Sequence, residues 1–166
     1  MRRSWAALGS SVFFLAAPGT VAGLIPWLLT RWTFRPLPPD LEPLRVVGAV
    51  LIAAGLIPLV ESFARFAWSG LGTPAPIAPT TRLVVTGFYR YVRNPMYVGV
   101  LSIILGQALL FAHAGLLWLS AIMLIAFHVF VIGYEEPTLS RTFGDDYARF
   151  RANVPRWLPR LRPWRP

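Results

Sequence analysis

Three carboxylates in this chain lie where they could do chemistry. Only seven residues are acidic, and three of them, Glu61, Glu135 and Glu136, lie within or at the end of long apolar runs. A carboxylate in such surroundings can bind a cationic ligand, move a proton or form an ion pair. Arg65 follows Glu61 by four residues, which is the favourable helical order for an ion pair, so a structural pair and a functional role both remain open.

The adjacent pair Glu135–Glu136 carries a further signal. We expect the apolar segment before it to form a helix that ends near residue 134. Two carboxylates at a helix C-terminus oppose the helix dipole, which favours cations there. Nearby arginines or a cationic ligand would offset this cost, and solvated acids at a helix end are the simpler alternative.

The sequence lacks the residues needed for several common kinds of catalytic and metal site. The chain has no Cys, which excludes disulfides, thiol nucleophiles, cysteine zinc sites and iron–sulfur clusters. His113 and His128 fall at opposite ends of the predicted bundle and cannot form a zinc site alone, so no metal is expected. The sequence also contains no phosphate-binding glycine loop, Ser–His–Asp set or HExxH motif.

The composition places these residues in a membrane protein. Hydrophobic residues make up 55% of the chain and charged residues 14%, whereas soluble domains average about 25% charged residues. The formal net charge is +9, and all 16 basic residues are Arg. A basic, apolar chain indicates anionic lipid head groups or an anionic cosubstrate, and no nucleic acid partner.

The apolar runs predict one all-α integral membrane domain over residues 1–166. The stretch 95–134 contains no charged residue, and as one helix it would be about 60 Å long, twice a bilayer core, so it must fold back near residues 112–115. A cleaved signal peptide is an alternative for the first run, although signal cores are only about 7–15 residues long. We expect four transmembrane helices at about 5–30, 44–68, 95–112 and 114–134, a loop at 69–94 and a tail at 135–166.

The arginines predict the orientation. Four spans put 13 of them, including the Arg2–Arg3 pair and those of the tail, on one side, and only Arg31, Arg35 and Arg45 on the other. The positive-inside rule then places both termini and the 69–94 loop in the cytoplasm, in a bacterial inner membrane.

The segments that flank the third and fourth predicted spans carry helix-capping and amphipathic patterns. Asn94 and Pro95 fit the N-cap and the first turn of the third span. Leu139, Phe143, Tyr147 and Phe150 share one face of an amphipathic interfacial helix, which lies on the membrane or docks on the bundle. From Val154 onward, Pro, Trp and Arg indicate an interfacial strap.

Two strings carry a family resemblance. The sequence LVVTGFYRYVRNPMYVG is followed, after an apolar hairpin, by EEPTLSRTFGDDYARFRANVPRWLP. In this order and spacing, over about residues 69–160, the chain resembles the isoprenylcysteine carboxyl methyltransferase-like family of membrane methyltransferases, and bacterial phospholipid N-methyltransferases share the signature. The first two spans resemble that family only in being apolar.

The resemblance implies an S-adenosylmethionine-dependent enzyme. Its acceptor would be a lipophilic small molecule, a lipid or a lipidated molecule, carrying a carboxyl, amine or hydroxyl group. The donor site would be closed by the last two helices and the tail. The positions that match donor-binding positions of the family, within and after the segment 81–84, are Leu83, Val84, Tyr89, Arg93, Asn94, Pro95, Met96, Tyr97 and Glu135.

Two positions depart from the family pattern. Asn94 replaces a His, so this position can bind and cap but cannot act as a base near neutral pH. Val131 replaces an Arg that contacts substrate in the prenylcysteine enzymes, which argues against a carboxylate-bearing prenylcysteine acceptor. If the acceptor needs a catalytic base, Glu61 and Glu136 are the candidates.

Two other readings belong to different classes. Sterol-type ene reductases share a related C-terminal signature and use NADPH, although their membrane region is longer than this chain allows. A non-catalytic four-span scaffold or lipid-binding protein with a vestigial signature is the other alternative. Binding of S-adenosylmethionine, of NADPH or of neither would discriminate among the methyltransferase, the reductase and the non-catalytic protein.

Overall fold

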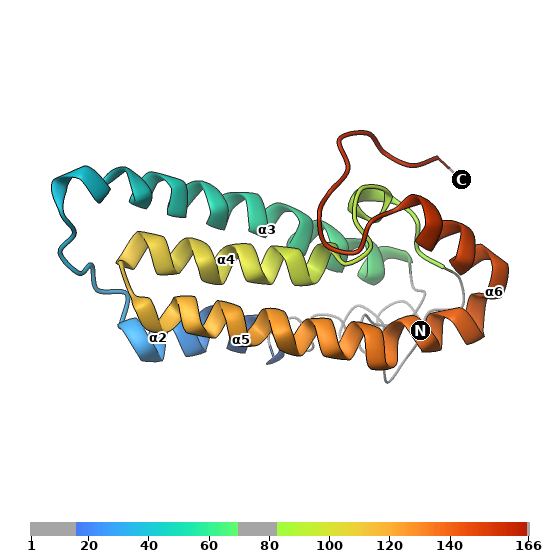
Figure 1. Cartoon of the computed structure of the whole chain (residues 1–166), viewed down its shortest axis with the longest axis horizontal. Helices are drawn as coiled ribbons and strands as arrows, with labels where there is room; N and C mark the ends of the chain where they lie inside the picture. The colour runs from blue at the N-terminus through green and yellow to red at the C-terminus, as the bar shows by residue number, and fades with distance from the viewer. Residues whose placement is uncertain (1–15, 70–82, 166) are drawn as a thin grey trace.

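The computed structural model describes residues 16–69 and 83–165, and every regular element in these two ranges is helical (Figure 1). The prediction of an all-α protein is confirmed. The start of the first expected span, the Arg2–Arg3 pair, the signal-peptide alternative and the loop residues 70–82 lie outside the described residues. The elements are η1 (Thr20–Leu24), α2 (Ile25–Thr30), η2 (Pro39–Leu41), α3 (Pro43–Ser69), η3 (Gly87–Arg90), α4 (Pro95–Phe111), α5 (Ala114–Phe130), η4 (Val131–Glu135) and α6 (Glu136–Asn153).

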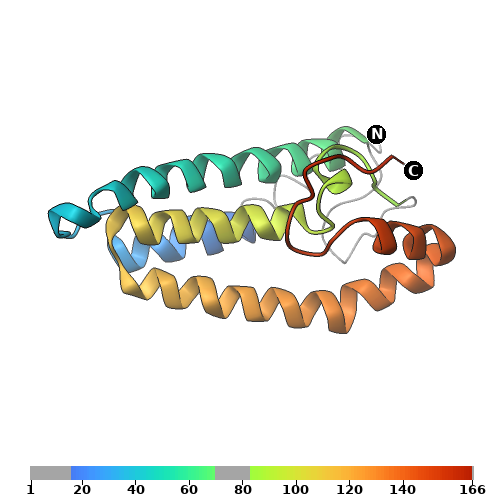
Figure 2. The same ribbon diagram turned by 45° about the horizontal axis from the view of Figure 1, so that its top comes forward.

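Helices α3 and α4 form the tightest pair in the bundle and run antiparallel, side by side, in Figures 1 and 2. Glycines face each other at two levels of this contact. A Cβ atom added to Gly48 would lie 2.6 Å from the carbonyl oxygen of Gly106, and one added to Gly55 would lie 2.6 Å from that of Gly99. Small residues at these levels let the two backbones touch, as is common between membrane helices.

A short turn connects α4 to α5 and returns the chain to the other end of the bundle. Ala112 adopts the left-handed conformation with φ 53°, and His113 is extended. This reversal lies within the tetrapeptide expected to form the turn. On the inner side, Leu59 and Phe63 of α3 pack against a buried stripe of α4 that includes Val100, Ile103 and Ile104.

The helical chain does not end after α5. It continues through one wide π-helical segment, η4, directly into α6. The expectation that Glu135 and Glu136 terminate a helix is therefore wrong. Pro137 lacks an N–H group and would clash in a regular helix, and the extra residue of a π turn offers a way to accommodate such a break without ending the helix.

Helix α6 bends back over the end of the bundle. Gly144 has φ 48° and ψ −120°, so the helix changes direction in its middle. The bend brings Tyr147 and Phe150 into a buried cluster with Val154, against Leu83 and Tyr89 of the loop before α4. This part of the amphipathic face is therefore buried against the loop before α4, and its placement relative to a membrane stays a prediction.

The tail after α6 crosses the loop at residues 83–94 (Figures 1 and 2). The backbone N–H of Arg93 donates to Pro155 O at 2.9 Å, and that of Arg160 donates to Tyr91 O at 3.0 Å. The N–H of Trp164 donates to Arg90 O at 2.9 Å. The tail is therefore fastened to the loop by main-chain hydrogen bonds, as a strap over the end of the bundle.

Two stretches of the described chain are helical, long and apolar enough to cross a membrane, namely Pro39–Arg65 and Ala114–Asn153. The apolar helices Thr20–Thr30 and Pro95–Phe111 are shorter. Large apolar side chains also point outward along α3 and α5, such as Val50, Ile57, Trp118 and Ile125, each at least 60% exposed. Such a surface fits contact with lipid and is unusual for a soluble protein.

Candidate functional site

A cavity of about 370 Å³ lies at the end of the bundle where the loop 83–94, the first turns of α4, and η4 with α6 meet. One part of its wall is polar and the other is apolar and aromatic. The polar part carries Tyr89, Arg93, Asn94, Tyr97, Glu135, Glu136 and Tyr147. The rest of the wall is formed by Ala17, Pro18, Val21, Phe63, Leu83, Val84, Met96, Val100, Phe127, Phe130, Val131, Leu139 and Phe150.

The loop before α4 reaches this wall because the tail holds it. Asn94 stands at the N-cap position of α4, followed by Pro95, but its side chain makes no capping hydrogen bond. Its amide nitrogen instead donates to Arg156 O at 3.1 Å, and the residue is only 7% exposed. The expected cap is therefore corrected: the side chain of Asn94 is used to attach the tail.

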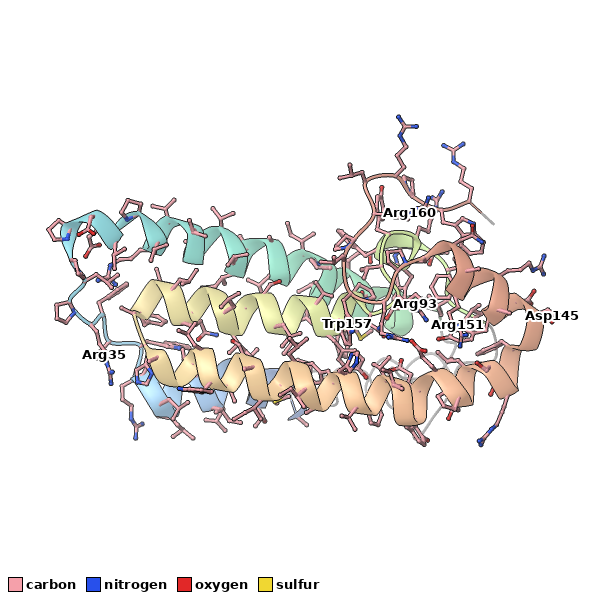
Figure 3. All side chains as sticks on the ribbon, viewed as in Figure 1. Arg35, Arg93, Asp145, Arg151, Trp157 and Arg160 are labelled. Carbon is pink, nitrogen blue, oxygen red and sulfur yellow. The ribbon has the colours of Figure 1, made fainter. Side chains whose placement is uncertain are left out.

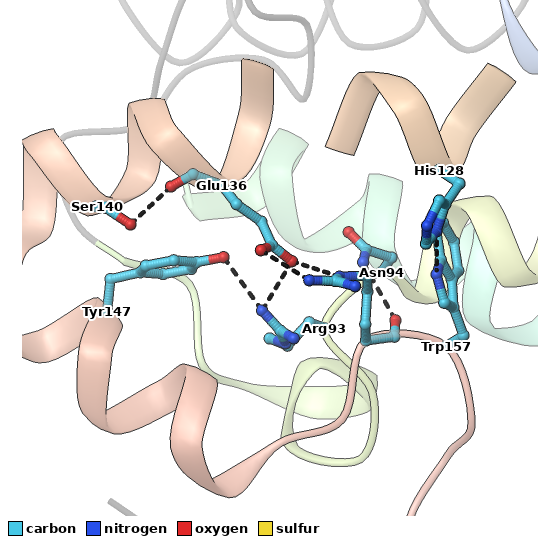
Figure 4. A network of polar contacts seen from close by, with 8 residues as sticks. Arg93, Asn94, His128, Glu136, Ser140, Tyr147 and Trp157 are labelled. Carbon is cyan, nitrogen blue, oxygen red and sulfur yellow. Dashed lines mark hydrogen bonds and ion pairs between the residues drawn. The ribbon is translucent and has the colours of Figure 1, made fainter. Parts of the chain in front are cut away.

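Glu136 is the centre of an ion-pair network (Figure 4). Its Oε1 accepts from Arg93 Nη1 at 2.9 Å and from Arg156 Nε at 2.6 Å, and its Oε2 accepts from Arg156 Nη2 at 3.0 Å. Burial acts to raise the pKa of this carboxyl, but the hydrogen bond from Arg156 and the charges of both arginines outweigh it and lower the pKa below 4.5. Glu136 is therefore ionised near neutral pH.

Glu135 has different surroundings from its neighbour. Its Oε2 accepts a hydrogen bond from the hydroxyl of Tyr97 at 3.2 Å, and the described residues give it no ion pair. The ring of Tyr97 in turn stacks on Phe127, with centroids 4.6 Å apart. The cavity thus offers one carboxylate without a bound cation beside two aromatic faces, an arrangement suited to a cationic ligand.

The tyrosine hydroxyls of the site stay protonated. Burial, and then the charges of Glu135 and Glu61, raise the pKa of Tyr89 above its ordinary value. Burial and the charge of Glu136 likewise raise the pKa of Tyr147, whose hydroxyl lies 3.4 Å from Arg93 Nη1. Both side chains therefore present O–H groups that can donate hydrogen bonds, not phenolates that could act as bases.

Glu61 forms the ion pair with Arg65 that the sequence predicts, but it is not among the lining residues of the cavity. The pair lies directly against Gly87, where a side chain would overlap both Glu61 and Arg65. Gly87 also has φ 57°, a conformation that favours glycine. The pair therefore packs against the loop that carries Tyr89.

Residues 44–146 match the sequence profile of a family described as phospholipid methyltransferase. The chain belongs to the phospholipid methyltransferase family. The match extends from the first turns of α3 into α6 and so includes both the glycine-paired helices and most of the cavity wall.

Two relatives share shorter stretches with this phospholipid methyltransferase family member. Over 77 residues it is 38% identical to the protein-S-isoprenylcysteine O-methyltransferase of Schizosaccharomyces pombe, which covers 46% of this chain and 33% of that relative. Over 64 residues it is 39% identical to an uncharacterized protein of Haemophilus influenzae, which covers 38% of this chain and all of that relative. The chain therefore matches about a third of the length of the yeast enzyme.

Most positions singled out by the resemblance to the methyltransferases lie together. Pro95 and Glu61 are not among the lining residues, and residues 81 and 82 lie outside the described ones. This grouping says where the side chains are, and their roles stay predictions. The predicted residues that line the cavity are Leu83, Val84, Tyr89, Arg93, Asn94, Met96, Tyr97, Glu135 and Glu136.

Three other residues that form or support the site are not assigned to it by the family signature. In the sequence, Tyr147 belongs to an apolar helix face, Phe127 to a predicted span and Arg156 to the arginine-rich tail. The regular spacing of Tyr147 with Phe150 was a usable signal, because it marks the face that docks. No spacing rule links Arg156 to Glu136, which lies 20 residues earlier.

Proposed function

We propose that this protein is an S-adenosylmethionine-dependent methyltransferase that modifies a lipid-soluble or membrane-embedded acceptor. The observation that carries the proposal is the divided cavity. Polar side chains able to hold a charged donor and an apolar wall able to hold a lipophilic acceptor line the same space in a member of this family. The donor supplies a methyl group on a positively charged sulfonium.

The residues present fit the parts of this donor. The Nε of Arg93 is buried without a hydrogen-bond partner among the described residues, so the guanidinium has capacity for a carboxylate. Glu135 can accept from an ammonium or a ribose diol. The faces of Tyr89 and Tyr97 can lie against adenine or the sulfonium. Leu83, Val84, Pro95 and Met96 would complete the donor site around these groups.

For the reaction, these side chains act mainly by placement. The acceptor atom must approach the methyl carbon in line with the bond to sulfur, so that one bond forms as the other breaks and S-adenosylhomocysteine leaves. Holding both partners in one apolar space, away from water, supplies much of the rate enhancement. Glu61 and Glu136 remain the proposed bases for an acceptor that must lose a proton, although Glu61 does not line the cavity and would have to act through an intervening group. The low pKa of Glu136 makes it a weak one.

The charges of the cavity wall indicate which chemical group the acceptor carries. Arg93 is the only cation among the described lining residues, and it already contacts Glu136 and Tyr147. Val131 lines the cavity where the prenylcysteine enzymes carry an arginine. An acceptor carboxylate would therefore lack a cation of its own, which favours an amine or hydroxyl acceptor over a carboxylate.

We further propose that the chain crosses a bacterial inner membrane four times. The first span would end in α2, and α3, α4 and α5 would form the other three. The spanning part of the longest helix would end near residue 134, because the chain then turns polar at Glu135. Both termini and the cavity mouth would face the cytoplasm, with α6 and the tail at the interface. A cytosolic donor and a membrane acceptor would then meet at one boundary.

A binding titration on detergent-purified protein tests the function. Wild type should bind S-adenosylmethionine, and Glu135→Gln should weaken binding by about tenfold or more through loss of the charge. Tyr97→Phe should cost less, about fivefold, because it keeps the ring stacked on Phe127. Leu158→Ala, at a residue 80% exposed on the tail, is the control.

The same titration separates the alternatives. Binding of NADPH without S-adenosylmethionine would indicate a reductase, and binding of neither would indicate a scaffold or lipid-binding protein. Either result would refute the methyltransferase proposal. Incubating membranes with methyl-labelled donor and identifying the labelled lipid or peptide would then name the acceptor.

A further inference from the structure

Arg156 lies on the tail and does not line the cavity. It nevertheless makes an extensive contact with Glu136, which does line the cavity. Its guanidinium donates from Nε and Nη2 to the two oxygens of Glu136, at 2.6 and 3.0 Å. Such two-pronged pairing between an arginine and a carboxylate is strong and directional. The guanidinium of Arg156 therefore contacts the cavity wall through Glu136.

Glu136 is shared between two arginines that differ in what else they face. Arg93 reaches only Oε1, at 2.9 Å, through one nitrogen, while Arg156 takes both oxygens. Arg93 lines the cavity, and its side chain is 10% exposed. One carboxylate between two guanidiniums leaves one positive charge unneutralised. Without Arg156, Glu136 would pair with Arg93 alone and cancel that charge.

The position of Arg156 is itself fixed by the loop that carries Arg93. The amide of Asn94 donates to the backbone oxygen of Arg156 at 3.1 Å, and the backbone N–H of Arg93 donates to Pro155 O at 2.9 Å. Figure 4 shows the contact of Asn94 with the tail as a dashed line close to the network around Glu136. Neighbouring residues of the loop thus hold the tail where Arg156 meets Glu136.

We propose that Arg156 is a positioning residue of the donor site. Through its bidentate contact with Glu136, Arg156 keeps the positive charge of Arg93 available for the carboxylate of the donor. The same contact fixes which oxygen of Glu136 Arg93 binds. The proposal rests on the function proposed above and adds a specific role for the tail. It predicts that Arg156 matters only for donors that carry a carboxylate.

The test compares two donors on purified full-length protein by calorimetric titration. Arg156→Gln should weaken binding of S-adenosylmethionine by about tenfold, the scale of a hydrogen bond to a charged group. It should leave binding of decarboxylated S-adenosylmethionine unchanged, since that ligand lacks the group that Arg93 would hold. Arg162→Gln removes the same charge from an exposed tail position and should change neither affinity.

Two more variants guard against a merely structural effect. Arg156→Lys keeps the charge without the fork and should retain part of the affinity, which also serves if Arg156→Gln folds poorly. The double variant Glu136→Gln/Arg156→Gln restores an unneutralised Arg93, so it should recover affinity for S-adenosylmethionine relative to Arg156→Gln. A purely structural role predicts a further loss there.

The opposite outcomes are distinct. An equal loss of affinity for both donors, or no loss for either in Arg156→Gln, would overturn the role of Arg156 while leaving the methyltransferase function intact. Failure of wild type to bind either donor would instead reject the proposed function.

Discussion

Glu135 and Glu136 are adjacent in the chain but are stabilised in different ways. Glu136 is 7% exposed and held by two guanidiniums, whereas Glu135 accepts a hydrogen bond from a neutral tyrosine hydroxyl. A buried carboxylate is tolerated when cations and hydrogen bonds replace its hydration. Glu136 meets this condition within the chain itself, while Glu135 leaves room for a cationic group of a ligand.

The lowered pKa of Glu136 gives the protein a predictable acid sensitivity. A carboxyl whose folded pKa lies below its unfolded value of 4.5 adds stability above that value and loses it as the pH falls through the folded pKa. Melting temperatures of wild type and Glu136→Gln in detergent should therefore differ by a constant amount between about pH 6 and 8, and the two should converge in stronger acid.

The control for this prediction is Asp146→Asn. Asp146 forms an exposed pair with Arg149 on α6, with both side chains about 70% exposed, and such pairs contribute little. Its melting temperature should follow that of wild type at every pH. A gap between wild type and Glu136→Gln that widened on acidification would contradict the assignment of Glu136 as the ionised centre of the network.

Individual contacts of the site differ in how well the sequence predicts them. The pair Glu61–Arg65 was predictable because i,i+4 spacing on a helix is a local rule. The segment Arg93–Tyr97 was found through a family signature. The contact of Arg156 with Glu136 was not found, since it depends on a helix that bends at Gly144 and a tail that returns over the loop, and neither is encoded by local spacing.

Among the elements, α3 and α4 place the loop 83–94 over the cavity, and their glycines set the distance between them. Gly48 and Gly55 are seven residues apart on α3, as are Gly99 and Gly106 on α4, so that both contacts fall on one face of each helix. In the sequence these glycines are only part of apolar runs. A glycine's role in helix packing emerges only when its partner helix is known.

Adding a methyl group at one of these levels should therefore destabilise the bundle. Gly55→Ala puts a Cβ 2.6 Å from Gly99 O, a backbone atom that cannot move alone. We expect a loss of about 1–3 kcal/mol in the free energy of unfolding, the usual cost of overpacking. Thermal or denaturant unfolding in detergent measures it.

Gly23→Ala is the matched control, because a Cβ at Gly23 meets no atom within 4 Å. That variant should be neutral or gain up to about 1 kcal/mol from helix propensity. If both alanine variants had the same stability as wild type, the close approach of α3 and α4 at Gly55 and Gly99 would be wrong.

The local structure at η4 also explains why the predicted helix end at Glu135–Glu136 was wrong. A polar Glu–Glu–Pro sequence after an apolar run is a normal stop signal. Here η4 widens the helix just before Pro137, and Thr138 Oγ1 donates to Tyr134 O at 2.7 Å, which satisfies one carbonyl across the junction. Because π-helical turns have no reliable sequence signature, the continuity of α5 with α6 could not be predicted.

Across the molecule, the arginines of the described residues divide between the two ends of the bundle. Arg31, Arg35 and Arg45 lie at the end where α2 stops and α3 begins, and Arg45 is bound there by Leu110 O and Glu42. Figure 3 shows Arg35 at this end, and Arg93, Arg151 and Arg160 at the opposite end with the cavity. This uneven division fits the positive-inside rule, and it supports the proposed topology.

This separation gives a topology that reporter fusions can test. A fluorescent protein fused after Pro166 should be bright and alkaline phosphatase fused there inactive, because the proposed topology keeps the arginine-rich end in the cytoplasm. Phosphatase inserted between Phe34 and Leu37, in the connection from α2 to α3, should be active instead. Replacing Arg31, Arg35 and Arg45 by Gln should leave both results unchanged, since it only deepens the asymmetry. Periplasmic activity of the C-terminal fusion would mean an inverted bundle or an odd number of spans, and in both cases the cavity would open away from the cytosolic donor.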